Sequence, residues 1–191
     1  MDLHLNVTEY FHGAVTSALK AKEVAASEPT EFYLVTLLTD FMSVHHISEE
    51  PIALKMAQAK EAPTPEARAR ALKEIGDTTL YMSGFHAERI AGRHGLVDVD
   101  YYISMGGAAY GQLASLVSAT RGSAVQFFRE AYAELSQKFA DFVEVLAAVR
   151  EGTSPEDPVK LWEKWVRSGS VTAERRLRES GVILGRGRSS N

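Results

Sequence analysis

The strongest hydrophobic pattern lies in residues 123–150, where large apolar side chains recur every three or four residues. The positions of this apolar seam are Val125, Phe128, Tyr132, Leu135, Phe139, Phe142, Leu146 and Val149. Such spacing places side chains along one face of an α-helix. We therefore predict one helix over residues 123–150, about 42 Å long at about 1.5 Å per residue, that forms the spine of a bundle. Packing of the seam within the chain is favoured over packing against a second copy.

Capping signals divide the preceding residues into further helices. Thr30, Ser48, Thr64 and Asp98 each precede a segment of helical length, with acidic residues or proline in its first turn. Side chains of Ser, Thr and Asp accept hydrogen bonds from the first unpaired backbone amides of a helix. No segment alternates apolar and polar residues between hairpin turns, as a half-buried strand would. The predicted fold is all-α, a single bundle of five or six main helices.

Prolines and small polar residues interrupt the helical pattern at residues 153–158. We predict a helical-bundle body at residues 1–152, a linker at 153–158 and a basic C-terminal tail at 159–191 that contains a short docking helix and a terminal peptide. Eight basic and three acidic residues give this tail a net charge of +5, whereas 13 basic and 22 acidic residues give residues 1–158 a charge of -9. If the tail is not simply solvated, this asymmetry predicts contact with an acidic surface.

Composition narrows the class of protein. At 191 residues and 45% hydrophobic, the chain can build one sizeable core. The absence of cysteine excludes disulfides, thiolate catalysis and cysteine-ligated zinc sites. The apolar runs are shorter than the roughly 20 residues that cross a bilayer, and the first residues lack a signal-peptide pattern. We expect a soluble cytoplasmic protein without a membrane span.

Glycines and polar residues gather in two consecutive predicted helices, at residues 72–90 and 97–111. Glycine inside a helix costs about 1 kcal/mol relative to alanine, which close helix packing or a ligand could offset. If the two helices are antiparallel neighbours, an imidazole, carboxylates and phenols would surround a floor of glycine, which suits proton transfer or recognition of a polar ligand. Close helix packing and helix capping by Asp98 are the competing interpretations. The candidate ligand-binding residues are Asp77, Tyr81, His86, Asp98, Tyr102, Gly107 and Tyr110.

Metal and haem sites are weaker alternatives. A di-iron bundle uses two Glu-x-x-His pairs and two further glutamates, and this chain has one such pair, Glu9 and His12. His45, His46, Glu49 and Glu50 add possible ligands at a helix junction. Haem could use His86 or His94 as an axial ligand. No complete cofactor or catalytic motif is present, so no cofactor is required and the balance is against an enzyme.

The C-terminal tail carries candidate partner-binding residues. Trp162 and Trp165 lie near one face of a short amphipathic helix, which favours docking on the bundle over insertion at a membrane interface. An isolated apolar triplet between glycines has the character of an extended peptide that fits a groove. The remaining candidates are Arg175, Arg176, Arg178, Val182, Ile183 and Leu184.

The sequence therefore favours a protein-interaction or regulatory module that acts through its bundle surface and basic tail as a homo-oligomer. Protein partners are favoured, and nucleic acid is possible through the tail. The alternative is a helical protein, with or without catalytic activity, that binds haem, a metal or a polar ligand around His86 and Tyr102.

Overall fold

The computed structural model describes residues 3–43, 48, 50–91, 98–118, 122–152 and 158–179. Within these ranges the chain is all-helical, with ten helices and no strand. The helices are α1 (Leu3–Ala21), α2 (Glu28–Ser43), α3 (Ile52–Lys60), α4 (Pro65–Phe85), α5 (Ala87–Ala91), α6 (Val99–Val117), α7 (Ser123–Gln137), α8 (Phe139–Gly152), α9 (Pro158–Ser168) and α10 (Val171–Glu179). The all-α prediction is confirmed, whereas the count of five or six main helices is not, because eight of the ten lie within residues 3–152.

Two of the predicted caps are confirmed and two are wrong. Thr64 accepts a hydrogen bond from the Ala67 amide at 3.1 Å, and Asp98 accepts one from the Tyr101 amide at 2.8 Å. Thr30 instead lies inside α2, which begins at Glu28, and its hydroxyl donates to Glu134. Ser48 lies before Pro51, the residue that precedes α3, and its hydroxyl accepts from the Glu50 amide.

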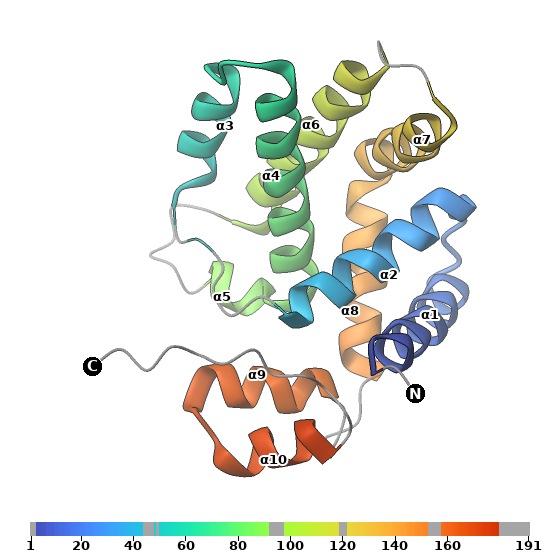
Figure 1. Cartoon of the computed structure of the whole chain (residues 1–191), viewed down its shortest axis with the longest axis vertical. Helices are drawn as coiled ribbons and strands as arrows, with labels where there is room; N and C mark the ends of the chain where they lie inside the picture. The colour runs from blue at the N-terminus through green and yellow to red at the C-terminus, as the bar shows by residue number, and fades with distance from the viewer. Residues whose placement is uncertain are drawn as a thin grey trace.

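The predicted long helix at residues 123–150 is two helices, α7 and α8, separated at Lys138 (φ -115°, ψ 30°). Figure 1 shows α7 nearly end-on while α8 runs down the view, so the two helices differ strongly in direction. No glycine or proline marks the break. The side chain of Lys138 donates to Glu134 one turn earlier on α7 at 2.8 Å and to the Ala25 carbonyl at 2.9 Å, and this second contact exists only once α7 packs beside the α1–α2 connection.

The apolar seam still faces the core of the bundle, in agreement with the prediction that it packs within the chain. Its last six positions, from Tyr132 to Val149, are buried, whereas Phe128 is exposed. Helix α4 lies at the centre and packs against α3, α6 and α8, while α2 packs against α1 and α7. No helix in the described ranges combines the length and apolar character needed to span a bilayer.

Helices α9 and α10 form a hairpin at one end of the bundle (Figure 1). Its buried side chains belong to the same hydrophobic cluster as those of the bundle; they are Val159, Leu161, Trp162, Ala173 and Leu177. The hairpin therefore contributes to the core. The division into a body at residues 1–152, a linker at 153–158 and a tail at 159–191 stays a prediction.

Candidate functional site

The predicted ligand-binding residues lie in two separate clusters. Asp77 and Tyr110 are joined directly, because the Tyr110 hydroxyl donates to Asp77 Oδ1 at 2.7 Å. Tyr81 and His86 form a second cluster, with ring centroids 5.3 Å apart. The helix pairing behind the prediction is present, since α4 packs along α6. Tyr81 lies one helical turn after Asp77 on α4, but the polar contacts of the two clusters run to different helices, those of Asp77 to α2 and α6 and that of His86 to α9.

The Asp77 cluster is a buried polar network that the sequence did not reveal in full. Besides Tyr110, the hydroxyl of Tyr33 on α2 donates to the same carboxylate oxygen at 2.5 Å. The Tyr33 ring meets those of Tyr110 and Tyr132 edge to face, which extends the network to α7. Burial, reinforced by Asp77, raises the pKa of both Tyr33 and Tyr110 far above the ordinary value, so both phenols remain protonated donors.

The charge of Asp77 is compensated at the outer edge of this network. Lys73 donates to Asp77 Oδ2 at 2.6 Å, and its ammonium group lies 5.4 Å from the centroid of the Tyr33 ring. Because Lys73 is one helical turn before Asp77, this ion pair could have been predicted from the sequence, whereas the Tyr33 contact spans 44 residues. The network links α2, α4 and α6 through one carboxylate, an arrangement that stabilises the core.

Neighbouring helices pack closely against several glycines of α4 and α6. A Cβ atom at Gly76 would lie 2.6 Å from the Tyr110 ring, and one at Gly106 would lie 2.2 Å from Phe139. The Gly107 carbonyl accepts a hydrogen bond from the Ser136 hydroxyl at 2.8 Å, while a Cβ at Gly84 would lie 2.5 Å from a side-chain atom of α8. The competing interpretation, close helix crossing, accounts for these positions.

His86 lies at the end of α4, where α9 covers it. Its Nε2 atom is 4.0 Å from Oε1 of Glu163 on α9, and both residues are largely buried. Burial, with nearby Arg89, lowers the pKa of His86 to about 4. The sequence did not identify Glu163, because it lies 77 positions later in the tail.

The remaining predicted ligand-binding residues do not contact His86 in the described part of the chain. Asp98 caps α6, as the competing interpretation expected. Tyr102 is partly buried against the core, and its ring meets that of Tyr101. A site that combines His86 with Tyr102 stays a prediction.

The metal candidates are also separated. His12 Nε2 lies 4.0 Å from Glu31, and Glu9 is exposed on the same helix. Glu50 accepts a hydrogen bond from Gln58 at 2.8 Å. Over the described ranges no three His, Asp or Glu residues are placed to hold a metal ion. His45, His46, Glu49 and the haem candidate His94 lie outside the described residues.

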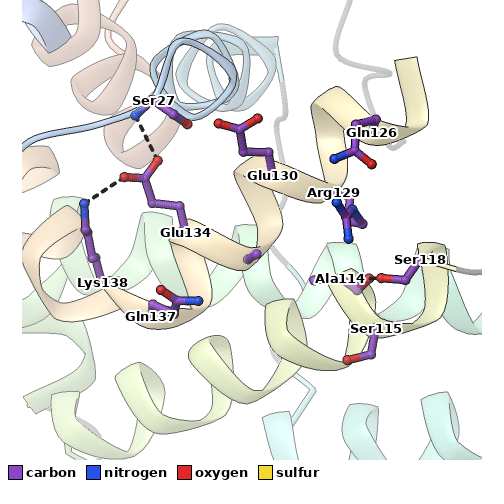
Figure 2. A pocket seen from close by; sticks show the side chains of 11 residues that line it. Ser27, Ala114, Ser115, Ser118, Gln126, Arg129, Glu130, Glu134, Gln137 and Lys138 are labelled. Atoms are coloured by element: carbon purple, nitrogen blue, oxygen red, sulfur yellow. Dashed lines mark hydrogen bonds and ion pairs between the residues drawn. The ribbon is translucent and has the colours of Figure 1, made fainter. Parts of the chain in front are cut away.

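A polar groove of about 600 Å³ runs between the end of α6 and α7 (Figure 2). Ala114, Ser115 and Ser118 line it from α6, and Arg129 and Glu130 are among the residues that line it from α7. At its far end Glu134 accepts hydrogen bonds from the Ser27 amide at 2.9 Å and from Lys138, as the dashed lines show. The groove contains none of the predicted ligand-binding residues.

An aromatic patch, which we define as Phe32, Phe127 and Phe128, lies on the surface of α2 and α7. Phe127 is in the middle, with ring centroids 5.7 Å from both Phe32 and Phe128. Phe32 is 52% exposed and Phe128 38% exposed. Phe127 does not belong to the apolar seam, whose members recur every three or four residues. A large aromatic residue outside the buried face of a helix indicates exposed aromatic surface, and the predictions from sequence did not use this indication.

The tail residues have different environments. Trp162 is buried and Trp165 packs partly buried against the core, consistent with the predicted docking of this helix. Arg175 and Arg176 are exposed on α10, where Arg178 pairs with Glu174 at 2.8 Å. Val182, Ile183 and Leu184 lie outside the described residues.

Comparison with known proteins identified no relative of the chain. No protein-family description, curated protein or solved structure matches the chain. The function must therefore be inferred from the residues and their geometry alone.

Proposed function

We propose that the protein is an interaction module that self-associates through the aromatic patch on α2 and α7. The observation that carries the proposal is the grouping of three phenylalanines at one surface position, two of them more than one-third exposed. Contiguous exposed aromatic surface costs solvation free energy in a monomer, and aromatic residues supply much of the binding energy at protein interfaces.

The patch rests on a rigid support. Phe128 stacks on Tyr132 one helical turn later, and Tyr132 in turn contacts Tyr33 and Tyr110 of the buried network. Side chains already held in place lose little conformational freedom on binding, which favours affinity. The patch therefore has the preorganised character of an interface centre.

A second copy of this chain is the partner that the surrounding charges favour. Arg129 and Glu130, of opposite sign, follow the patch on α7 and line the adjoining groove. In a two-fold symmetric dimer each surface meets its own copy, so that Arg129 of one protomer can face Glu130 of the other. A polar rim of this kind around an aromatic centre is typical of protein interfaces.

Sedimentation equilibrium of the full chain tests this proposal. We expect the wild-type chain to dimerise with concentration, and a Phe32→Ser/Phe128→Ser variant to associate at least about tenfold more weakly, since an interface anchor contributes more than about 1 kcal/mol. Leu54→Ser on α3 is the matched control, because Leu54 is 49% exposed but lies outside the patch. A wild-type chain that stays monomeric, or equal association of the patch variant and the control, would contradict the proposal.

The basic tail is the second part of the proposal. Its net charge of +5 against -9 on the rest of the chain favours electrostatic contact with an acidic protein surface. Such contacts weaken with salt, because the Debye length falls from about 10 Å at 0.1 M to about 3 Å at 1 M. Nucleic acid is the less favoured partner, since Trp162 is buried in the core rather than placed as a base-stacking platform.

The alternative function, haem, metal or polar-ligand binding around His86 and Tyr102, has a direct test. A visible absorption spectrum and metal analysis of the purified chain would reveal a Soret band or stoichiometric iron. Either result would reverse the ranking of the two functions.

A further inference from the structure

The contact between α9 and the bundle contains buried polar atoms without hydrogen-bond partners among the described residues. They are Nε1 of Trp162 and Oε1 of Glu163, on consecutive residues of α9. Buried polar groups in native proteins are nearly always paired, and an unpaired one carries the full cost of its desolvation. The docking of the hairpin α9–α10 is therefore weakened at the same place where Val159, Leu161 and Trp162 stabilise it by apolar burial.

His86 is the bundle residue that faces this carboxylate. The separation of 4.0 Å between His86 Nε2 and Glu163 Oε1 is too long for a hydrogen bond, and the two groups form an ion pair only when His86 carries a proton. The His86 side chain is 9% exposed and that of Glu163 is 24% exposed. The other titratable and charged groups around the two side chains are Tyr81 on α4, Glu88 and Arg89 on α5, Arg150 on α8 and Arg167 on α9.

The neighbouring charges do not replace either member of this pair. Arg150 binds Glu88 through two hydrogen bonds, at 2.8 Å and 3.0 Å, so a carboxylate other than Glu163 already engages its guanidinium group. Glu163 Oε1 accepts no hydrogen bond in the described part of the chain. Arg150, Arg167 and Arg89 act on this carboxyl group through their charge, without a hydrogen bond to Oε1 in the described part of the chain.

We propose that His86 and Glu163 form a titratable latch through which the α9–α10 hairpin docks reversibly on the bundle. Release of the hairpin would expose the bundle surface that Val159, Leu161 and Trp162 cover. Docking buries both titratable groups and release returns both to water, so each group contributes its own pH dependence to docking.

The two groups have opposite effects on the pH dependence of docking. Burial lowers the pKa of His86 from 6.5 to about 4, so the released form binds more protons at this site and docking weakens as pH falls from 6.5 towards 4. Burial raises the pKa of Glu163 above 4.5, so the docked form binds more protons there and docking strengthens as pH falls through the raised pKa. In the wild-type chain the two effects offset each other, and removal of one group reveals the other.

Intrinsic tryptophan fluorescence reports hairpin docking directly, because the chain has two tryptophans and both lie on α9. Trp162 is 4% exposed, so release of the hairpin would shift its emission to longer wavelength. Far-ultraviolet circular dichroism, recorded in parallel, separates release of the hairpin from unfolding of the bundle. The experiment uses the full chain titrated from pH 7 to pH 4.

Glu163→Gln keeps the shape of the side chain and removes its titration. We expect the emission of this variant to shift to longer wavelength between pH 6.5 and 4 while its helical signal is retained, with the docking equilibrium falling by up to about tenfold per pH unit. His86→Gln should show no such shift, and the double variant should be independent of pH in this window. His12→Gln is the matched control, because His12 is exposed on α1.

Three results would overturn the latch. The first is a pH profile of Glu163→Gln that equals that of the wild-type chain or of His86→Gln. The second is an emission change that always coincides with loss of helix, which would make the hairpin inseparable from the bundle. The third is a Glu163→Gln or His86→Gln chain that is unfolded at pH 7, which would assign the pair to the essential core.

Discussion

Replacement of Asp77 by alanine tests whether the core is organised around a single buried carboxylate. Asp77 Oδ1 accepts hydrogen bonds from the hydroxyls of Tyr33 and Tyr110, and Oδ2 accepts one from Lys73. Tyr110 is completely buried and Tyr33 nearly so. Asp77→Ala would therefore leave the phenolic hydroxyls of two buried tyrosines without their acceptor.

The magnitude follows from the number of unpaired groups. A buried hydroxyl without a partner costs about 1–3 kcal/mol, so two of them predict a loss of about 4 kcal/mol in the free energy of unfolding. Domains of ordinary stability have about 5–15 kcal/mol in total, so the variant would be close to marginal. With a urea dependence of about 2 kcal/mol per M, the unfolding midpoint should fall by about 2 M.

Equilibrium unfolding in urea, followed by far-ultraviolet circular dichroism, measures this loss. Lys73→Ala is the control, because it removes a partly exposed ion-pair partner of the same carboxylate and should cost less than about 1 kcal/mol. Tyr110→Phe should destabilise the wild-type chain but be neutral or stabilising in the Asp77→Ala background, since it then removes an unpaired hydroxyl. Equal losses for Asp77→Ala and Lys73→Ala would refute the reasoning.

Two further stability predictions follow from packing and from charge. Gly106→Ala should lower the free energy of unfolding by about 1–3 kcal/mol, because the new Cβ atom would lie 2.2 Å from the Phe139 ring. Gly13→Ala on α1 should instead raise the free energy of unfolding by about 0.5–1 kcal/mol, because no atom lies within 4 Å of the new Cβ position. Urea unfolding of both variants checks the contrast. Burial opposes the charge of Glu134, but the hydrogen bonds that it accepts prevail and lower its pKa to about 2, below the ordinary 4.5. The contribution of Glu134 to stability is therefore complete above pH 4.5 and is lost as pH falls towards 2. The difference in melting temperature between the wild-type chain and Glu134→Gln should shrink over that range. Glu144→Gln, at an exposed glutamate, is the control and should differ little from the wild-type chain in melting temperature. A difference that persists unchanged to pH 2 would contradict the assignment.

The sequence by itself determined that the chain is helical and where several helices begin. The three-and-four spacing of apolar residues and the caps at Thr64 and Asp98 depend on groups within a few residues of each other, so they are readable without tertiary contacts. The sequence also offered close helix packing as an explanation for the glycines of α4 and α6, and the structure shows close contacts at several of them. The sequence further anticipated the packing of α4 against α6, although the structure places the short helix α5 between them along the chain.

Only the tertiary structure decided how these helices turn and which polar groups meet. The break at Lys138 has no glycine or proline to mark it in the sequence, and the Lys138 side chain reaches the Ala25 carbonyl 113 positions earlier. Two predicted site residues have partners on helices outside the predicted pair. Asp77 accepts a hydrogen bond from Tyr33 on α2, and His86 faces Glu163 on α9; these partners lie 44 and 77 positions away along the chain. Hydrogen bonds and burial across such separations depend on how whole helices pack, and the hydrophobic periodicity that predicts a helix does not specify its neighbours.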